Sequence, residues 1–335
     1  MSRRGWLLFA AMSVIWGIPY LLIKVAVGGV PVPVLVLTRV AVGAALLLPI
    51  AIRQGQLRVL LPRWRWLVLF ACVEIIVPWL LLSEAETRLS SSLSGLLVAS
   101  VPILVAVLSR LTGGTDRLTP VRWAGLLLGL AGVGLLVGPS ASGGDLGSVA
   151  EVLVVALGYA IGPLIAARKL GDLPPLAMTA VCLTLASVVY APLAAVTWPS
   201  ALPSAKVLAA LAGLAVVCTA LAFVIFFALI ADAGPARASV ITYINPAIAV
   251  TGGVWLLGER LTPAMAGAFA LILGGSVLAT RTGRGTPPEP AAPAGPVGPG
   301  DRGELTAPDR GADRTEPGQL AGPGRNRAAP LHQPD

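Results

Sequence analysis

Ten apolar stretches divide the first 282 residues of this chain, and each is long enough to cross a lipid bilayer as a helix. The core of a bilayer requires about 20 apolar residues per helix. The stretches lie at residues 5–27, 33–52, 65–83, 91–111, 120–138, 148–168, 176–197, 207–230, 237–257 and 264–281. The connections between them are short, so no extramembrane domain is expected before residue 283. We therefore predict an all-α polytopic membrane protein with ten transmembrane helices.

The composition agrees with a membrane protein and argues against other classes. Hydrophobic residues make up 56% of the chain and charged residues 12%, whereas soluble domains carry about 25% charged residues. The basic residues stand in small groups between apolar stretches and do not form the patch that binds nucleic acid. The only histidine is His332, and no Gly-x-x-x-x-Gly-Lys-Ser/Thr motif for ATP is present. We expect no metal, no cofactor and no nucleic-acid partner.

The distribution of Lys and Arg between alternate loops predicts the orientation, because cytoplasmic loops carry an excess of both. One side collects fourteen: Arg3, Arg4, Arg53, Arg58, Arg63, Arg65, Arg110, Arg117, Arg122, Arg168, Lys169, Arg237, Arg281 and Arg284. The other side collects four: Lys24, Arg88, Lys206 and Arg260. This predicts a cytoplasmic (inner) membrane protein with both termini in the cytoplasm. Residues 283–335, rich in Pro and Gly, are expected to form a disordered cytoplasmic tail.

The sequence also repeats itself at a spacing of 144 residues. Pro19 recurs as Pro163, and Pro102 recurs as Pro246. With a one-residue slip, Asp-Arg-Leu-Thr-Pro at 116–120 recurs as Glu-Arg-Leu-Thr-Pro at 259–263. Because five predicted spans per copy is an odd number, the second copy must enter the membrane from the opposite side. We predict inverted repeats at 1–139 and 140–282, an architecture typical of secondary transporters.

Several motifs resemble the EamA family of the drug/metabolite transporter superfamily. They are Trp16-Gly17-Ile18-Pro19, Arg39, Pro102, Asn245-Pro246 and Leu257-Gly258-Glu259-Arg260-Leu261-Thr262-Pro263. The resemblance covers residues 5–281 and implies export or uptake of a small metabolite by two inverted five-helix halves. It also implies that spans one, three, four, six, eight and nine line a central cavity, with spans five and ten outside. The first turn departs from the family pattern, with Gly113-Gly114-Thr115-Asp116 in place of Gly-Glu.

Glu74 lies near the middle of the third predicted span and is the only carboxylate expected deep in any span. A charge near the bilayer centre costs at least about 2.5 kcal/mol, whereas a protonated acid is tolerated more easily. Glu74 is therefore a candidate for proton coupling. A structural role is the alternative, in which Glu74 forms an ion pair with Arg39 of the second span.

Other residues suit a substrate path or a hinge. Aromatic and amide groups give an apolar pocket a few hydrogen-bonding points, and with Glu74 the path candidates are Trp16, Tyr20, Trp79, Tyr159, Tyr243 and Asn245. Prolines within spans leave carbonyl groups without helical donors, and the hinge candidates are Pro19, Pro102, Pro163 and Pro246. The alternatives are membrane-interface anchoring for the aromatic residues and static kinks for the prolines. Anchoring is expected outright for Trp6, Trp64, Trp66, Trp123 and Trp198.

Small residues spaced four apart occur in two spans, Gly125/Gly129 and Ala266/Ala270/Gly274. Such stripes let helices approach closely, and a homodimer through these faces is a candidate arrangement.

These features together predict a secondary active transporter, more specifically a proton-coupled exporter of a small metabolite or drug-like compound that works by alternating access. Its partners would be that substrate and the lipid bilayer. One alternative is a facilitator of the same fold that needs no gradient. The other is a membrane-embedded enzyme for lipid-linked substrates, for which Glu84 and Glu86, with Arg88, are the only candidate residues.

Overall fold

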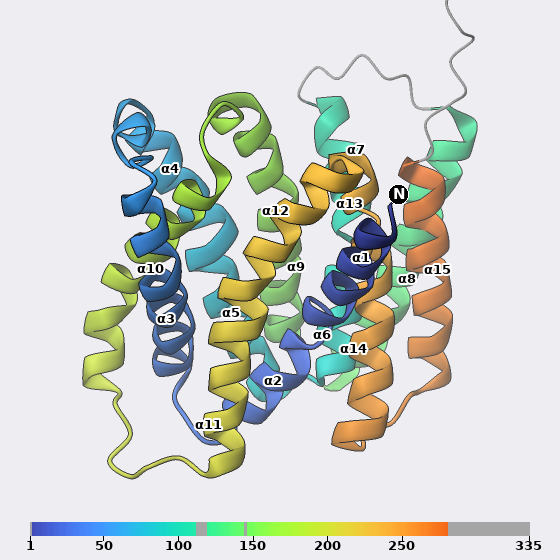
Figure 1. The fold of residues 1–335 in the computed structure, drawn as a ribbon. Helices are drawn as coiled ribbons and strands as arrows, with labels where there is room; N and C mark the ends of the chain where they lie inside the picture. Colours follow the sequence, from blue (N-terminus) through green and yellow to red (C-terminus); the bar gives the residue numbers. More distant parts are fainter. Residues whose placement is uncertain (1, 112–118, 144–145, 281–335) are drawn as a thin grey trace, which may run out of the picture. The chain divides into compact units, whose positions relative to one another are not determined.

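The computed structural model describes residues 2–111, 119–143 and 146–280, and in these ranges the chain is helical without any strand (Figure 1). The α-helices are α1 (Arg3–Ile15), α2 (Pro19–Ala26), α3 (Val32–Arg53), α4 (Trp64–Ala71), α5 (Val77–Arg88), α6 (Ser91–Val98), α7 (Val101–Leu111), α8 (Pro120–Gly143), α9 (Leu146–Ile165), α10 (Pro175–Val196), α11 (Ala205–Ala212), α12 (Ala222–Ala233), α13 (Pro235–Ala238), α14 (Ile241–Leu257) and α15 (Pro263–Thr280). One short 3₁₀ helix, η1 (Arg58–Arg63), and three π-helical segments, η2 (Cys72–Ile76), η3 (Ala166–Leu170) and η4 (Gly213–Leu221), adjoin them. The predicted turn around Asp116 and the predicted tail lie outside the described residues.

Seven helical segments, two of them with a short internal break, are long and apolar enough to cross a membrane. They are Arg3–Ala26, Val32–Arg53, Arg58–Arg88, Ser91–Leu108, Leu146–Leu170, Pro175–Val196 and Ala205–Ala233. Three further helices are apolar but shorter, at Pro120–Leu136, Ile241–Leu257 and Pro263–Ala279. The prediction of an all-helical membrane protein is thus confirmed, while the count of ten spans and the inverted repeat stay predictions.

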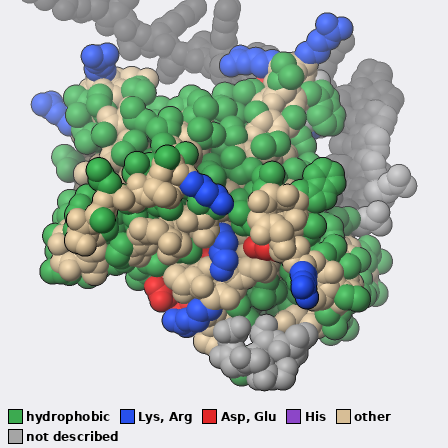
Figure 2. Space-filling view, turned by 90° about the horizontal axis from the view of Figure 1, so that it is seen from below, with side chains coloured by type: hydrophobic (Ala, Val, Ile, Leu, Met, Phe, Trp, Pro, Cys, Tyr) green, Lys and Arg blue, Asp and Glu red, His purple; other side chains and the backbone are tan. Residues whose placement is uncertain are grey.

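The outer surface of the bundle is apolar. Large side chains such as Leu7, Val188 and Val196 are more than two-thirds exposed, and Figure 2 shows hydrophobic side chains over much of one face, with charged groups near its middle. Such a surface suits lipid and would be unfavourable in water. All five tryptophans expected to anchor the chain at the membrane interface are exposed.

Two closely packed helix pairs lie at opposite edges of the bundle in Figure 1: α3 with α10, and α8 with α15. Helices α2, α5, α6, α9, α12 and α14 lie between these pairs. Helices α8 and α15 correspond to the predicted spans five and ten, which the family resemblance puts outside the central cavity.

Glycines allow α8 and α15 to touch backbone to backbone. A Cβ atom on Gly275 would lie 2.4 Å from the Gly129 nitrogen and 2.6 Å from the Gly125 oxygen. The Gly125/Gly129 stripe is therefore covered by α15 of the same chain, and a second copy cannot use it. Ala266 and Ala270 of the other stripe are exposed, so a homodimer through that face stays a prediction.

The first helix is broken just before Pro19, and Asn245 fills the gap. The Gly17 amide donates to the Val14 carbonyl, which leaves the Ser13 carbonyl without its usual helical donor. In the orientation that its surroundings require, the Asn245 side-chain amide donates to the Ser13 carbonyl at 3.1 Å and to the Ile241 carbonyl at 3.0 Å. Asn245 therefore ties α14 to the broken end of α1.

The four predicted hinge prolines differ in their surroundings. Pro19 begins α2, and Pro102 follows the break at Ala99 and Ser100 between α6 and α7. Pro163 and Pro246 lie inside the continuous helices α9 and α14. Only the first two adjoin an interruption of the helix, and hinge motion at any of them stays a prediction.

Candidate functional site

Arg39 of α3 is held in the interior by two other elements. It is only 6% exposed. Its Nε donates a hydrogen bond of 2.9 Å to the Thr219 hydroxyl of η4. Its Cζ lies 3.6 Å from the centroid of the Trp79 ring of α5, which is a cation–π contact. The guanidinium is thus fixed at one edge and over one face.

Other polar side chains lie near this guanidinium. Tyr20, Glu86, Tyr159 and Cys218 all lie close enough to act on Arg39 electrostatically. We call the following group the central cluster: Tyr20 of α2, Arg39 of α3, Trp79 and Glu86 of α5, Tyr159 of α9 and Thr219 of η4. The cluster contains three of the predicted path residues, namely Tyr20, Trp79 and Tyr159.

Glu86 is fully buried, and neither of its carboxyl oxygens has a hydrogen-bond partner among the described residues. Nearby, Lys24 Nζ donates to the backbone carbonyls of Glu86 and Leu89, each at 2.7 Å. The structure thus adds Glu86 as a second enclosed carboxylate, while the expectation that Glu74 alone lies deep in a span stays a prediction. The predicted third span ends at residue 83, but α5 continues to Arg88. The spacing of Trp79, Ser83 and Glu86 on one helix face was the signal that could have found it.

Glu74 lies in the π-helical segment η2, packed against α9. Its Oε2 is enclosed without a hydrogen-bond partner among the described residues. A Cβ atom on Gly162 would collide with this carboxyl group, and one on Gly158 would lie 2.5 Å from the Val73 carbonyl oxygen. The two glycines, four residues apart, therefore let α9 approach η2 closely.

The predicted ion pair between Arg39 and Glu74 is not formed. In the described part of the chain, ion pairs join Arg63 to Asp172 and Arg88 to Glu84. Arg39 is directed instead to Thr219 and Trp79, because these lie on the elements that pack against α3.

The remaining predicted path residues lie apart from the central cluster. Trp16 packs against Phe223 and Phe226 of α12, with ring centroids 6.1 and 4.6 Å away. The Tyr243 hydroxyl lies 3.5 Å from the Ser276 carbonyl. With Asn245 bound to α1, these three contacts join helices. Contact of the three residues with substrate stays a prediction.

Glu259, part of the family-like turn, anchors the start of α6. Gly258 ends α14 with φ of 67°, a left-handed conformation that favours glycine. The Glu259 carboxylate then accepts hydrogen bonds from the backbone amides and hydroxyls of both Ser91 and Ser92. Partial burial acts to raise its pKa, but these four hydrogen bonds together outweigh burial and hold the pKa below its ordinary value.

Because the folded-state pKa of Glu259 is lowered, its stabilising contribution is complete above the ordinary glutamate pKa of about 4.3 and is lost as the pH falls through the lowered value. We expect Glu259→Gln to cost roughly 1 kcal/mol near neutral pH, as the loss of a helix N-cap does. Thermal unfolding of the native protein and the variant between pH 7 and pH 3 would measure this. The difference between them should shrink on acidification, and a difference independent of pH would contradict the role of the carboxylate.

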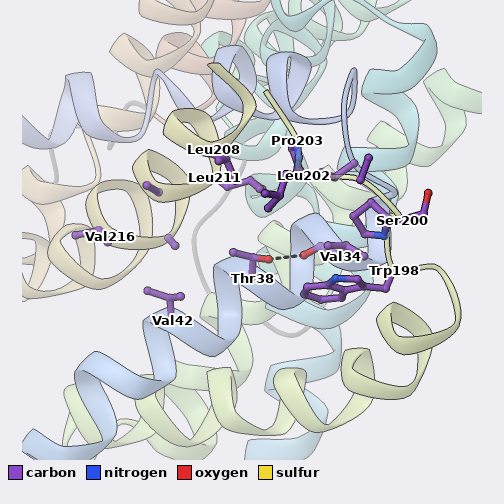
Figure 3. Close-up of a pocket in the computed structure, with 15 residues that line it drawn as sticks. Val34, Thr38, Val42, Trp198, Ser200, Leu202, Pro203, Leu208, Leu211 and Val216 are labelled. Carbon is purple, nitrogen blue, oxygen red and sulfur yellow. Dashed lines mark hydrogen bonds between the residues drawn. The ribbon is translucent and has the colours of Figure 1, made fainter. Parts of the chain in front are cut away.

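A cavity of about 510 Å³ lies elsewhere, between α3, residues 198–203 and α11 with η4 (Figure 3). Its wall is almost wholly apolar, with Val34, Val42, Leu208 and Leu211 among the lining residues. Thr38 also lines it, but its hydroxyl donates to the Val34 carbonyl at 2.8 Å, so only its acceptor lone pairs remain for a ligand. The cavity contains none of the predicted site residues, and its chemistry suits an apolar chain.

Within the described ranges, no group of three or more His, Cys, Asp or Glu residues is placed to hold a metal ion. Glu84 and Glu86 thus have no third ligand beside them. Glu84 is paired with Arg88 at 3.4 Å, while Glu86 is sealed in the interior. The arrangement does not resemble a metal-dependent active site.

An apolar helical bundle with an enclosed polar and aromatic cluster is compatible with a membrane transport protein. The model of the EamA-like transporter family matches residues 3–138 and again residues 148–281. The chain belongs to this family, and it is a transporter and not an enzyme.

Individual relatives agree with this assignment. The chain is 29% identical over 278 residues to the "Uncharacterized inner membrane transporter YedA" of Escherichia coli K12, covering 81% of this chain and 88% of the relative. It is 24% identical over 281 residues to the "Uncharacterized transporter YvbV" of Bacillus subtilis, covering 81% and 90%. A solved crystal structure matches with a TM-score of 0.59 at 22% identity, covering 82% of this chain and 96% of that one. At this identity the last similarity shows the fold alone.

Proposed function

We propose that this protein is a secondary active transporter that exports a small metabolite or drug-like compound across the cytoplasmic membrane by alternating access. Its ten spans would form two inverted repeats, 1–139 and 140–282, with both termini in the cytoplasm. Two successive matches to one family model support the repeat. Five spans per repeat, an odd number, would require the inversion.

The central cluster carries this proposal, because both halves of the chain build it. Tyr20, Arg39, Trp79 and Glu86 come from the first family match, and Tyr159 and Thr219 come from the second. A site between two repeats can be exposed alternately to either side when the halves rock against each other.

The π-helical segments add support to the proposed repeat. At the spacing of 144 residues, Glu74 in η2 corresponds to Cys218 in η4. π-Helical turns occur frequently at functional sites, because the extra residue in the turn breaks the regular hydrogen-bond pattern. Equivalent positions in the two halves would then carry equivalent irregularities beside the cluster.

Proton coupling is the proposed driving force, with Glu74 as the proton-exchanging group. Its enclosed, unpartnered Oε2 beside Gly162 supports this. The gradient-independent facilitator of the same fold is the alternative, in which Glu74 is structural.

Glu74→Gln in proteoliposomes is expected to abolish transport driven by a pH gradient and to leave the protein folded, because glutamine cannot exchange a proton. A metabolite extract supplies the substrates, and mass spectrometry of the vesicle contents reads transport with and without the gradient. Glu84→Gln is the matched control, since Glu84 lies on α5 and is 42% exposed. Gradient-driven flux that persists in Glu74→Gln would remove Glu74 from the coupling, and gradient-independent flux in the native protein would favour the facilitator.

A further inference from the structure

We propose that Arg39 binds the carboxylate group of the transported compound, which makes small organic carboxylates with an apolar body the substrate class. This inference rests on the proposed function and names the substrate of the same cluster. It also gives Arg39 a role other than the ion pair that the sequence predicts.

The hydrogen bonds of Arg39 leave two of its nitrogens available. A guanidinium carries five N–H donors. Arg39 uses Nε for the Thr219 hydroxyl, and within the described chain neither terminal nitrogen has a protein acceptor. The side chain is 6% exposed. The two terminal nitrogens have no protein partner among the described residues, and neither is completely enclosed. The terminal nitrogens therefore keep a small exposed surface and have unused N–H donors.

This end is also held in a fixed direction. Thr219 Oγ1 accepts from Nε and itself donates to the Leu214 carbonyl at 2.8 Å, so its position is set by η4. The Trp79 ring covers one face of the guanidinium. A planar, oriented pair of terminal NH₂ groups matches the two oxygens of a carboxylate.

Electrostatics favour an anion at this position. No carboxylate of the described chain lies within ion-pair distance of Arg39. The ion pairs in the described ranges involve Arg63 and Arg88 instead. Glu86 acts on Arg39 electrostatically but does not contact it. A buried cation without a contacting anion is unfavourable, and a substrate carboxylate would supply the missing partner.

The surroundings indicate what the rest of the substrate is like. Tyr20 and Trp79 are buried beside Arg39, and Tyr159 is half-buried there. Such side chains offer apolar surface with a few polar atoms. An aromatic or similarly apolar body attached to the carboxylate fits this environment better than a sugar or a second charge does.

The test compares ligands that differ only in charge. Purified protein is heated with benzoate or benzamide, and with phenylacetate or phenylacetamide, and the shift of its unfolding temperature is titrated. The acids should bind the native protein and the amides should bind much more weakly. Arg39→Gln should lower the affinity for the acids roughly 10- to 100-fold, the usual cost of losing a charge-assisted hydrogen bond.

Two further variants keep the test decisive if Arg39→Gln does not fold. Arg39→Lys retains the charge but loses the planar pair of donors, and Thr219→Val releases the Nε edge, so each should weaken binding of the acids. Arg63→Gln is the matched control, because Arg63 pairs with Asp172 at the surface and its loss should leave binding unchanged.

The results separate this inference from the proposed function. Three results would overturn the carboxylate assignment. They are equal shifts of the unfolding temperature by acids and amides, no shift with any acid, and unchanged selectivity for acids in the Arg39 and Thr219 variants. Transport of neutral compounds from the metabolite extract would leave the transporter function standing in that case. Absence of all transport by the native protein would count against the function itself.

Discussion

The Gly275→Ala variant is expected to unfold at a clearly lower temperature than the native protein. The added Cβ atom would lie 2.4 Å from the Gly129 nitrogen, 2.6 Å from the Gly125 oxygen and 2.7 Å from the Gly129 Cα. All three are backbone atoms, which cannot move aside as a flexible side chain can. Helices α8 and α15 would have to separate, and we expect a loss of about 2–3 kcal/mol, as for other overpacked interiors.

The neighbouring glycine provides a matched control for this prediction. A Cβ atom on Gly274 meets only Leu128 Cδ2, at 3.8 Å, which is ordinary contact. Gly274→Ala should therefore be neutral, or stabilise the helix by up to about 1 kcal/mol. Thermal unfolding of both variants in the same detergent measures the difference. Equal stability of the two would mean that α8 and α15 are not in backbone contact.

Replacing Glu86 is expected to have the opposite effect on stability. Glu86→Met should raise the free energy of unfolding by about 1–3 kcal/mol, because an enclosed polar group without a partner costs that much. Transport should also fall in this variant. Because the buried acid lowers the stability of the fold, we expect that it is kept for transport. Thermal unfolding and proteoliposome flux would be measured on one preparation.

Glu84→Met is the control for this substitution. Glu84 is 42% exposed and paired with Arg88, and exposed ion pairs contribute about 0.2–1 kcal/mol. Its loss should lower stability slightly and leave flux intact. If Glu86→Met destabilises the protein instead, then the Glu86 carboxyl has a stabilising partner, for which Lys24 is the nearest cation.

The helical membrane architecture could be predicted because it depends on local composition. The predicted second span at 33–52 and α3 at Val32–Arg53 differ by one residue at each end. Prediction failed where polarity rises within a helix. Residues 83–86, Ser-Glu-Ala-Glu, look like a loop in a hydropathy pattern, yet they continue α5 because their buried face meets neighbouring helices.

The candidate site was only partly predictable, since its contacts join distant residues. Trp79, Tyr20 and Tyr159 could be named from their chemistry, but Arg39 with Thr219 is a contact across 180 positions. Glu259 was visible as part of a motif, while its partners Ser91 and Ser92 lie 168 and 167 positions away. No periodicity encodes such pairings, and they follow only once the helices are packed.

The contact between Glu74 and Gly162 has a consequence for the history of the sequence. The carboxyl group occupies the space that a side chain at 162 would need, so the two positions share one volume. Bulk gained at 162 displaces the Glu74 carboxyl group from its place against α9. A lineage that enlarges residue 162 must therefore move the carboxyl group of residue 74 or shorten that side chain, so the identities of the two residues are linked.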